Sequence, residues 1–472
     1  MHCGRLSALL VLLSLTGFLT TLDNTVINVA LPTVQEDLGL DVADLEWVAA
    51  SYVLSFGALL LAGGRVADLG GRRAVLAVGI AVFVLASCAA ALAGSGTALI
   101  AARAVQGAGA ALVVPASLAI VASDLPARRR ATAIGLWTAS LALALALGPV
   151  IGGFVTEHWD WSWVFLLNVP VGAVALVLVP AVPAAGRRGA DRLRTSLLDV
   201  PGVVLSAVAL FLLTYALVKG GEHTFSAPPV PLCLWLSAAT GAAFLLVETR
   251  TFVPLVDLRM FRDRMLVGGV VAQVLWGAGV NGVFFFTALY LQQILAFSPV
   301  EAGLVFLPLA GALLLGTPFA ERAARLVGAH RSIAAGLVLV AAGLLLVSGT
   351  GADASYADLQ PGLLLIGVGS SLTTPLTVRS IADVPATRTG TASGLVSAAR
   401  EISGVFGVVL VGIVLTRTER DALRDGAAPH TAFLDGYDTG LRLAAGCVLL
   451  GAAVSVVTLR RPGHHCRRRR SG

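Results

Sequence analysis

The chain of 472 residues consists largely of apolar runs of about 20 residues that are separated by short polar breaks. A transmembrane α-helix needs about 20 apolar residues to cross the hydrocarbon core of a bilayer. Hydrophobic residues make up 57% of the chain and charged residues 13%, about half the ~25% of soluble domains, and the mean hydropathy is +0.87. We therefore expect an all-α integral membrane protein with 14 transmembrane helices, at residues 5–30, 47–67, 74–93, 97–122, 132–155, 164–182, 200–219, 230–248, 265–293, 301–320, 332–349, 360–380, 389–416 and 440–459.

Basic residues are distributed unevenly between alternate loops. If the N-terminus lies inside, most of the 33 basic residues fall in inner segments, whereas the outer loops hold Lys219, Arg417, Arg420 and Arg424. Because cytoplasmic loops are enriched in Lys and Arg, we expect both termini to be cytoplasmic. The two longest polar breaks then divide the chain into an N-terminal six-helix bundle (1–182), two extra linker helices (183–264), a C-terminal six-helix bundle (265–459) and a basic cytoplasmic tail (460–472).

Several functional classes lack support in the sequence. The basic residues lie between apolar runs, which does not indicate a nucleic-acid partner, and there is no G-x-x-x-x-G-K-[ST] phosphate-binding loop. The metalloprotease H-E-x-x-H and hydrolase G-x-S-x-G patterns are absent as well. The five cysteines show no pairing pattern. We therefore expect neither an enzyme nor a cofactor or metal site. The first apolar run exceeds a signal-peptide core in length, so we expect a retained helix.

The first apolar run is interrupted by polar residues, in the stretch "TLDNTVINVALP", where Asp23 is followed by Asn24. A charged aspartate near the middle of a bilayer costs roughly 2.5–3.5 kcal/mol on insertion scales. At 1.5 Å per residue, Asp23 lies about 10 Å below the outer end of its helix, and Arg103 in the fourth run lies about 9 Å below the same surface. Equal depth permits contact between this acid and this base.

Three roles for Asp23 remain open. It can carry a proton, binding H⁺ from outside and releasing it to the cytoplasm while Arg103 alternately pairs with it. It can instead form a permanently ionised structural pair with Arg103, or serve as a polar packing site. A charged side chain inside a membrane protein must face a partner or a water-filled cavity. The first two roles meet this condition by giving Asp23 the partner Arg103.

The break after the second run reads "GGRVADLGGRRAVL" and places Gly64, Asp68, Gly71, Arg72 and Arg73 in the pattern G-x-x-x-D-x-x-G-R-R. Glycine permits a tight turn, and the charges fix the depth of the hairpin. This stretch resembles the signature loop of the major facilitator superfamily of secondary transporters. The family often has an arginine where this chain has Leu69, which weakens the implied charge network.

Two further motifs agree with this resemblance. The stretch "ARAVQGAGAALVVPASLAI" resembles the fourth-helix motif of the family, whose arginine is implicated in proton transfer, and it places Arg103 and Gln106 on one helix face. The stretch "ALALALGPVIGGFV" resembles the end of the motif that marks antiporters, with Ala144 where the fuller pattern has glycine. The matching residues there are Gly148, Pro149, Gly152 and Gly153.

Together with "HWDWSWVFLLNVPVG", "ALYLQQILAFSPVEAGLVFLP" and "GTASGLVSAAREISGVFGVVLVGIVL", these motifs resemble the fourteen-helix drug:proton antiporter branch over nearly the whole chain. The resemblance implies two bundles with pseudo-two-fold symmetry, the bacterial plasma membrane, and proton-coupled export of hydrophobic or amphipathic small molecules by alternating access. We expect a monomer. Uptake of a nutrient by proton symport is the alternative, and Gly148–Pro149 argues against it.

Polar and aromatic residues within the apolar runs predict a central substrate cavity. We expect it to be mostly apolar, with aromatic residues of the ninth run such as Phe284 and Phe285, although these could equally face lipid. The substrate would then be neutral or singly cationic. The predicted cavity residues are Asn24, Asn28, Gln106, Gln273, Trp276, Asn281, Tyr290, Gln292, Arg400 and Glu401.

Overall fold

A computed structural model describes residues 3–460, apart from 126, 183–198, 223–224, 252–253, 382–383 and 385–388. The side chains of some residues inside its helices, among them Asp68 and Glu401, lie outside the described part. The described residues form helices joined by short turns. The α-helices are α1 (Cys3–Leu38), α2 (Val42–Gly70), α3 (Arg72–Ala91), α4 (Gly96–Asp124), α5 (Ala127–His158), α6 (Ser162–Leu166), α7 (Asn168–Leu178), α8 (Val200–Glu222), α9 (Val230–Arg250), α10 (Arg264–Leu289), α11 (Pro299–Val305), α12 (Leu307–Val327), α13 (Ala329–Ser348), α14 (Tyr356–Leu372), α15 (Leu376–Ser380), α16 (Thr389–Arg424) and α17 (Pro429–Thr458).

Twelve helical segments in the described part of the chain are long and apolar enough to cross a membrane. All fourteen predicted ranges overlap helices. Helix α5 has 32 residues, of which Leu143–His158 is the apolar segment found in the described part, and α14 has 17 residues. The prediction of an all-helical, multi-span membrane protein is confirmed, whereas the count of fourteen spans and the side on which the termini lie stay predictions.

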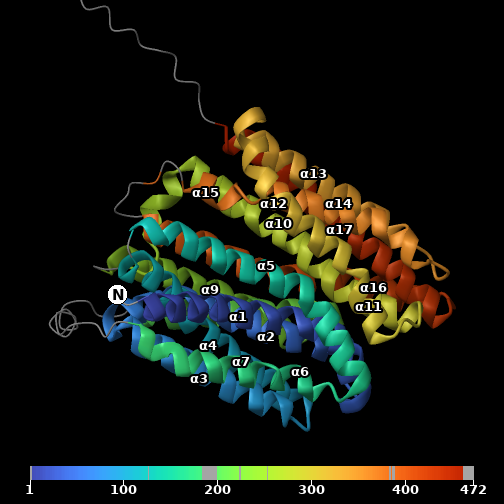
Figure 1. Ribbon diagram of the computed structural model, residues 1–472. Coiled ribbons are helices and arrows are strands. Elements are labelled where there is room, and N and C mark those ends of the chain that lie inside the picture. Colours follow the sequence, from blue (N-terminus) through green and yellow to red (C-terminus); the bar gives the residue numbers. More distant parts are fainter. Residues whose placement is uncertain are drawn as a thin grey trace, which may run out of the picture.

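The helices gather in two groups, which Figure 1 shows as α1–α7 on one side and α10–α17 on the other. In the first group α2 packs on α4, α1 on α5 and α3 on α4, and in the second α10 packs on α16 and α17, and α13 on α14. Helices α8 and α9 pack on each other, and α8 also contacts α2 and α16. In the apolar segments of α8 and of α9 only 17% of the residues are buried, against 72% in α10. Helices α8 and α9 therefore lie at the periphery.

Short side chains let α4 approach its neighbours closely. A methyl group at Gly107 would overlap the carbonyl oxygen of Tyr52 in α2, and one at Gly109 would lie 2.8 Å from the backbone nitrogen of Phe83 in α3. Small residues permit such close backbone contact between membrane helices. The same approach brings the polar residues of α4 into contact with α2 and α3.

The turn between α2 and α3 is shorter than the sequence predicted. Helix α2 continues to Gly70, so Gly64 lies inside a helix and not in the turn, where we had expected it. Gly71 alone has a left-handed backbone, with φ of 88°, which favours glycine. Arg72 and Arg73 open α3. The predicted charge network of this loop depends on Asp68, whose side chain lies outside the described part.

Other helix ends also differ from the predicted ends. Helix α16 continues to Arg424, so Arg417, Arg420 and Arg424 are helical residues and not loop residues, and α17 begins at Pro429. Hydropathy reports the thickness of the apolar layer, whereas a helix ends where capping or a turn residue stops it. The first polar linker (183–198) and the tail beyond Arg460 fall outside the described residues.

Candidate functional site: a buried acid–base cluster beside a central cavity

Asp23 lies at the centre of a buried polar cluster that joins four helical segments. Its Oδ2 atom is 2.5 Å from Nη1 of Arg103 in α4. Its Oδ1 atom accepts hydrogen bonds of 2.6 Å from Nε2 of Gln106 and from Nδ2 of Asn168. Ser87 in α3 also accepts hydrogen bonds from Gln106 (2.8 Å) and Asn168 (3.3 Å). Asp23 is 2% exposed and Arg103 is fully buried.

The guanidinium of Arg103 is held by aromatic rings as well as by the acid. Its central carbon lies 4.4 Å from the ring centre of Tyr52 and 5.8 Å from that of Phe165. Its Nε donates to the carbonyl of Val48 at 3.4 Å. These contacts place a positive charge over aromatic faces, which carry negative charge density.

The donors around Asp23 match an ionised carboxylate, which can only accept hydrogen bonds. A buried ion pair is tolerated only when further hydrogen bonds satisfy its remaining atoms. Most of the cluster meets this condition, but Nη2 of Arg103 and Oδ1 of Asn168 are buried without a partner in the described part of the chain. Most hydrogen-bonding atoms of the cluster therefore have a partner, and these two atoms do not.

The sequence places Asp23 and Arg103 at equal depth in the membrane, which permits a contact between them. In the structure the two side chains are in direct contact. Sequence reasoning missed Asn168 and Ser87 as members of the cluster. A signal for Asn168 was available, because it is the polar interruption in the apolar stretch "VFLLNVPVG". Gln106, which we had expected in the substrate cavity, belongs instead to this cluster, where Asp23 and Arg103 engage both ends of its amide.

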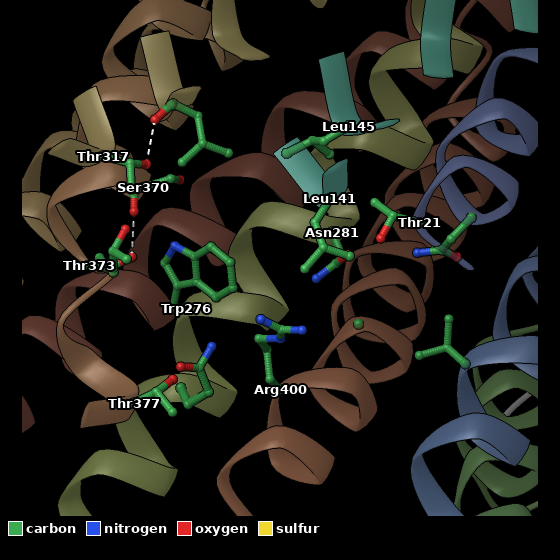
Figure 2. A pocket seen from close by; sticks show the side chains of 16 residues that line it. Thr21, Leu141, Leu145, Trp276, Asn281, Thr317, Ser370, Thr373, Thr377 and Arg400 are labelled. Atoms are coloured by element: carbon green, nitrogen blue, oxygen red, sulfur yellow. Dashed lines mark hydrogen bonds between the residues drawn. The ribbon is translucent and has the colours of Figure 1, made fainter. Parts of the chain in front are cut away.

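A central cavity of about 360 Å³ lies between the two groups of helices. Figure 2 shows side chains from both groups converging on it, with Thr21 and Leu141 across from Trp276 and Thr373. The lining residues are Thr21, Asn24, Val53, Leu141, Leu145, Gln273, Trp276, Asn281, Leu313, Thr317, Ser370, Thr373, Thr374, Thr377, Arg400 and Gly404.

Half of the predicted cavity residues line this cavity, namely Asn24, Gln273, Trp276, Asn281 and Arg400. Asn28 lines a small adjoining cavity together with Asn24 and Asn281. The side chain of Glu401 is outside the described part.

Two predicted cavity residues serve contacts elsewhere. Tyr290 is buried, stacks on Tyr437 with ring centres 4.8 Å apart, and donates a hydrogen bond to the carbonyl of Gly351. Gln292 donates to the carbonyl of Val29 in α1 at 2.9 Å. The aromatic residues Phe284 and Phe285 pack on Phe306 and Phe286 and do not line the cavity.

The cavity wall is more polar than the sequence predicted. Hydroxyl groups were missed, at Thr21, Thr317, Ser370, Thr373, Thr374 and Thr377. Ser and Thr have hydropathies near zero and fit within an apolar helix, where the hydroxyl can donate to a carbonyl of the preceding turn. Thr317 does so to Leu313, and Thr373 to Ser370. Only the packing of α1, α12, α14, α15 and the turn after α14 places these hydroxyl groups at the cavity.

Glycines of the predicted antiporter motif lie where α5 meets its neighbours. A methyl group at Gly148 would overlap the side chain of Thr25 in α1, and one at Gly152 would lie 2.6 Å from the carbonyl oxygen of Val26. Gly153 faces the backbone of Pro299 in α11, on the opposite group of helices. The motif therefore forms part of the seam between the two groups.

Hydrogen bonds join the two groups at the same end of the molecule. Gln293 donates to Gln35 at 2.8 Å, and the amide of Val300 donates to the carboxylate of Glu157 at 3.1 Å. The Val300 amide, and then Ser298, hold the pKa of Glu157 below its usual value of 4.5. The molecule is thus closed at the end where α5 stops and α11 starts, and the cavity lies behind that closure.

The sequence matches the family model described as "Major Facilitator Superfamily" over residues 13–408. Among its relatives, the "Cephamycin export protein CmcT" of Amycolatopsis lactamdurans is 39% identical over 410 residues, covering 85% of this chain and 83% of the relative. The "Puromycin resistance protein pur8" of Streptomyces alboniger is 35% identical, covering 95% and 90%. The "Multidrug resistance protein Stp" of Mycobacterium tuberculosis is 34% identical, covering 84% and 74%.

Solved structures share the fold at low sequence identity. An inward-facing, unoccupied bacterial homologue of the human lysosomal transporter Spinster superimposes with a TM-score of 0.70 at 17% identity, covering 98% of both chains. A peptide transporter of the POT family in complex with sulfate gives a TM-score of 0.68 at 16% identity, covering 95% and 93%. With its family match, its bacterial relatives and its helical fold, the chain belongs to the major facilitator superfamily, as a multi-pass membrane transporter and not an enzyme.

Proposed function

We propose that this protein is a proton-coupled antiporter that exports hydrophobic or amphipathic small molecules by alternating access. The observation that carries the proposal is the Asp23–Arg103 pair, an acid and a base at 2.5 Å inside an apolar helix group. Ionisable residues inside membrane proteins are costly and rare, and they often mark ion pathways or proton relays. In this mechanism Asp23 binds a proton and loosens its hold on Arg103, then releases the proton and restores the pair.

The cluster lies close to the central cavity but is shielded from it. A second cavity of about 170 Å³ is lined by Thr21, Asn24 and Arg400, which also line the central cavity, and by Tyr52. Tyr52 stacks on Arg103 and donates through its hydroxyl to the carbonyl of Thr20 at 3.2 Å. A small shift of Tyr52 would therefore connect Asp23 with the cavity, which supports its use as the proton site.

We propose that the state described here opens to the cytoplasm. With both termini inside and fourteen spans, the end closed by Glu157, Val300 and Gln293 faces outward, and the cavity lies on the inner side of that closure. Two six-helix bundles would then rock about the cavity while the peripheral helices α8 and α9 follow, as in other transporters built from repeats. The native unit would be a monomer in the bacterial plasma membrane.

Asp23→Asn tests the proposal in inverted membrane vesicles whose lumen is acidified. An antiporter should draw a fluorescent substrate into the lumen and release luminal protons, whereas a symporter would move substrate and protons outward together. We expect Asp23→Asn to abolish the proton-driven exchange while insertion and expression persist. Proton-driven exchange at the wild-type rate in Asp23→Asn would remove Asp23 from the mechanism.

A matched control is available on the same helix. Asp37 also lies in α1 and accepts a hydrogen bond from the indole of Trp161 at 2.8 Å, away from the cluster. Asp37→Asn removes one carboxylate from α1 without touching Arg103, so we expect proton-driven exchange to continue in it. Equal loss in both variants would point to a general effect of charge and not to proton coupling at Asp23.

A further inference from the structure

A further cavity lies beside the peripheral helices α8 and α9, and we call it the side cavity. Its volume is about 280 Å³. Helix α2 of the first group, α10 and α16 of the second group, α8, α9 and the segment that follows α9 all contribute to its wall. One lining residue from each of these elements, in chain order, is Ala58, Leu210, Phe244, Val256, Val274 and Ala398.

The wall of the side cavity is apolar. Among the described residues that line it, Ser206 is the one with a polar side chain, and its hydroxyl donates to the carbonyl of Val203 in its own helix at 3.0 Å. A buried water needs two to four polar partners, whereas an engineered apolar cavity of about 150 Å³ stays dry and binds benzene. A cavity with this wall and this volume therefore suits a hydrocarbon group and not water.

Helix α16 separates the side cavity from the central cavity. Arg400 and Gly404 line the central cavity, whereas Ala398 and Ile402 line the side cavity. With about 3.6 residues per turn, a spacing of two residues places side chains on nearly opposite faces of a helix. The side cavity is thus a separate site, and a molecule bound in it does not occupy the central cavity.

The elements around the side cavity are packed on one another. Helix α2 meets α16 where a methyl group at Gly57 would lie 2.6 Å from the side chain of Ile402. In the segment after α9, the amide of Val256 donates to the carboxylate of Glu248 at 3.2 Å, and Val256 is 5% exposed. The wall is therefore held in place from both helix groups and from the segment that follows α9.

The surroundings of α8 and α9 indicate which hydrocarbon is available. Both helices are long and apolar enough to cross a membrane. Their outward side chains are exposed, and examples are Val204 (52%) and Leu246 (58%). In a membrane such side chains face lipid tails, which are as apolar as leucine. Lipid acyl chains are thus the apolar groups that lie next to the side cavity.

We propose that the side cavity binds an acyl chain of a membrane lipid, which lies beneath α8 and α9 and contacts both helix groups. An empty void leaves its lining atoms without dispersion partners on one side, and a bound chain restores these contacts. Because the wall comes from both groups, the chain favours the relative position of the groups in which this cavity exists. The site is independent of proton coupling at Asp23.

Photo-cross-linking of the full-length transporter in nanodiscs tests this proposal. The probe is a phosphatidylethanolamine with a diazirine in one acyl chain, added in small amount to phosphatidylethanolamine and phosphatidylglycerol. On irradiation the diazirine loses nitrogen, the carbene inserts into nearby bonds, and mass spectrometry locates the adducts. We expect adducts at Val256 and Ala398, although each is only 5% exposed. Lipid-facing Leu246 should also react, whereas Leu344, which is fully buried in α13, should not.

Variants that fill the side cavity supply the matched comparison. Ser206→Phe adds a ring to the cavity from α8 and should abolish the adducts at Val256 and Ala398, while Leu246 reacts as before. Val204→Phe adds the same ring to the same helix at an exposed position and should keep all adducts. Ala399→Phe fills the cavity from α16 and should act as Ser206→Phe does, which separates filling from a local effect on α8.

The proposal is overturned if the adducts at Val256 and Ala398 in the wild type do not exceed those at Leu344. Adducts that persist in both filling variants, or that are lost equally in Val204→Phe, would overturn it as well. An excess of Nile red, an uncharged lipophilic dye without an acyl chain, should leave the adducts unchanged. Displacement by Nile red would assign the side cavity to small lipophilic molecules and reject the lipid.

Discussion

The backbone of Pro299 in α11 lies so close to Gly153 in α5 that a single added methyl group would overlap its carbonyl oxygen. The relationship is reciprocal, because Gly303 in α11 faces the backbone of Pro149 in the same way. In each helix, a glycine thus packs against the backbone of a proline in the other helix. This contact joins the two helix groups at the closed end.

Gly153→Val should force α5 and α11 apart and open the closed end. The branched side chain has no space at the Pro299 backbone, and backbone atoms cannot move aside as a flexible side chain can. In a cysteine-free background, Asn24→Cys in the cavity should react faster with an impermeant maleimide added from the outer side when Gly153→Val is present. Gly241→Val is the control, because nothing lies within 4 Å of a methyl group there. Equal labelling in both would contradict a seal at Gly153.

Asn168→Leu should impair proton-driven exchange without preventing insertion. It removes one of three donors to Asp23, and a hydrogen bond to a charged group is worth about 1.5–3 kcal/mol. We expect the rate to fall by about tenfold or more, since ~1.4 kcal/mol corresponds to a factor of ten. The measurement is dye exchange in inverted vesicles at fixed expression. Wild-type exchange in Asn168→Leu would show that this amide is dispensable.

The closed end should loosen in strong acid and not near neutrality. The Val300 amide and Ser298 lower the pKa of Glu157 from 4.5. A group with a lowered pKa stabilises the contact at pH above its unperturbed value and loses this effect as the pH falls through the lowered value. Because the thiolate is the reacting form of cysteine, the rate of labelling of Asn24→Cys from outside is divided at each pH by the rate of a small free thiol. This ratio should be constant between about pH 6 and 8 and rise below about pH 4.5, the unperturbed pKa of Glu157.

Glu157→Gln should remove this acid-induced rise, because glutamine does not ionise. Asp160→Asn is the matched control. Asp160 is exposed near Glu157 and bonds the amide of Ser162 on its own chain segment, not α11. An undiminished acid response in Glu157→Gln would assign the effect to another group.

Tyr437→Phe should destabilise the second helix group modestly. The Tyr437 hydroxyl lies 2.8 Å from the hydroxyl of Thr287, and both residues are fully buried. Hydrogen bonds between membrane helices contribute about 0.6 kcal/mol on average, with a maximum of about 1.7, because the unfolded chain in the membrane also finds hydrogen-bond partners. We expect a loss in that range in unfolding by detergent titration. Tyr356→Phe, at a residue that is 45% exposed, should show no loss.

The membrane helices could be predicted from the sequence because hydrocarbon imposes a length on each apolar run. The Asp23–Arg103 contact could be anticipated because both residues are rare charges and helix rise fixes their depth. Gln106 was misplaced because depth does not fix rotation about the helix axis. Gln106 faces α1 and α3 with Arg103, and three residues of spacing alone do not tell which neighbour that face meets.

The cavity was harder to predict than the acid–base cluster. Tyr290 and Gln292 follow directly on α10, yet they form a single π-helical turn, Tyr290–Ile294, which rotates them away from the face of Trp276. Ser370 and Thr373 carry no charge and no strong hydropathy signal. Their place in the wall depends on how α14 packs against α12, which is a property of the assembled bundle.

Asp23, Arg103, Gln106, Ser87 and Asn168 all come from α1, α3, α4 and α7, on one side of the cavity. In the proposed rocking motion, Asp23 and Arg103 would move together as parts of one rigid body. The motion alone would then not separate this ion pair, unlike a contact that spans both helix groups. Coupling between proton binding and substrate binding would instead depend on side chains that line the cavities beside the cluster, such as Tyr52 and Arg400.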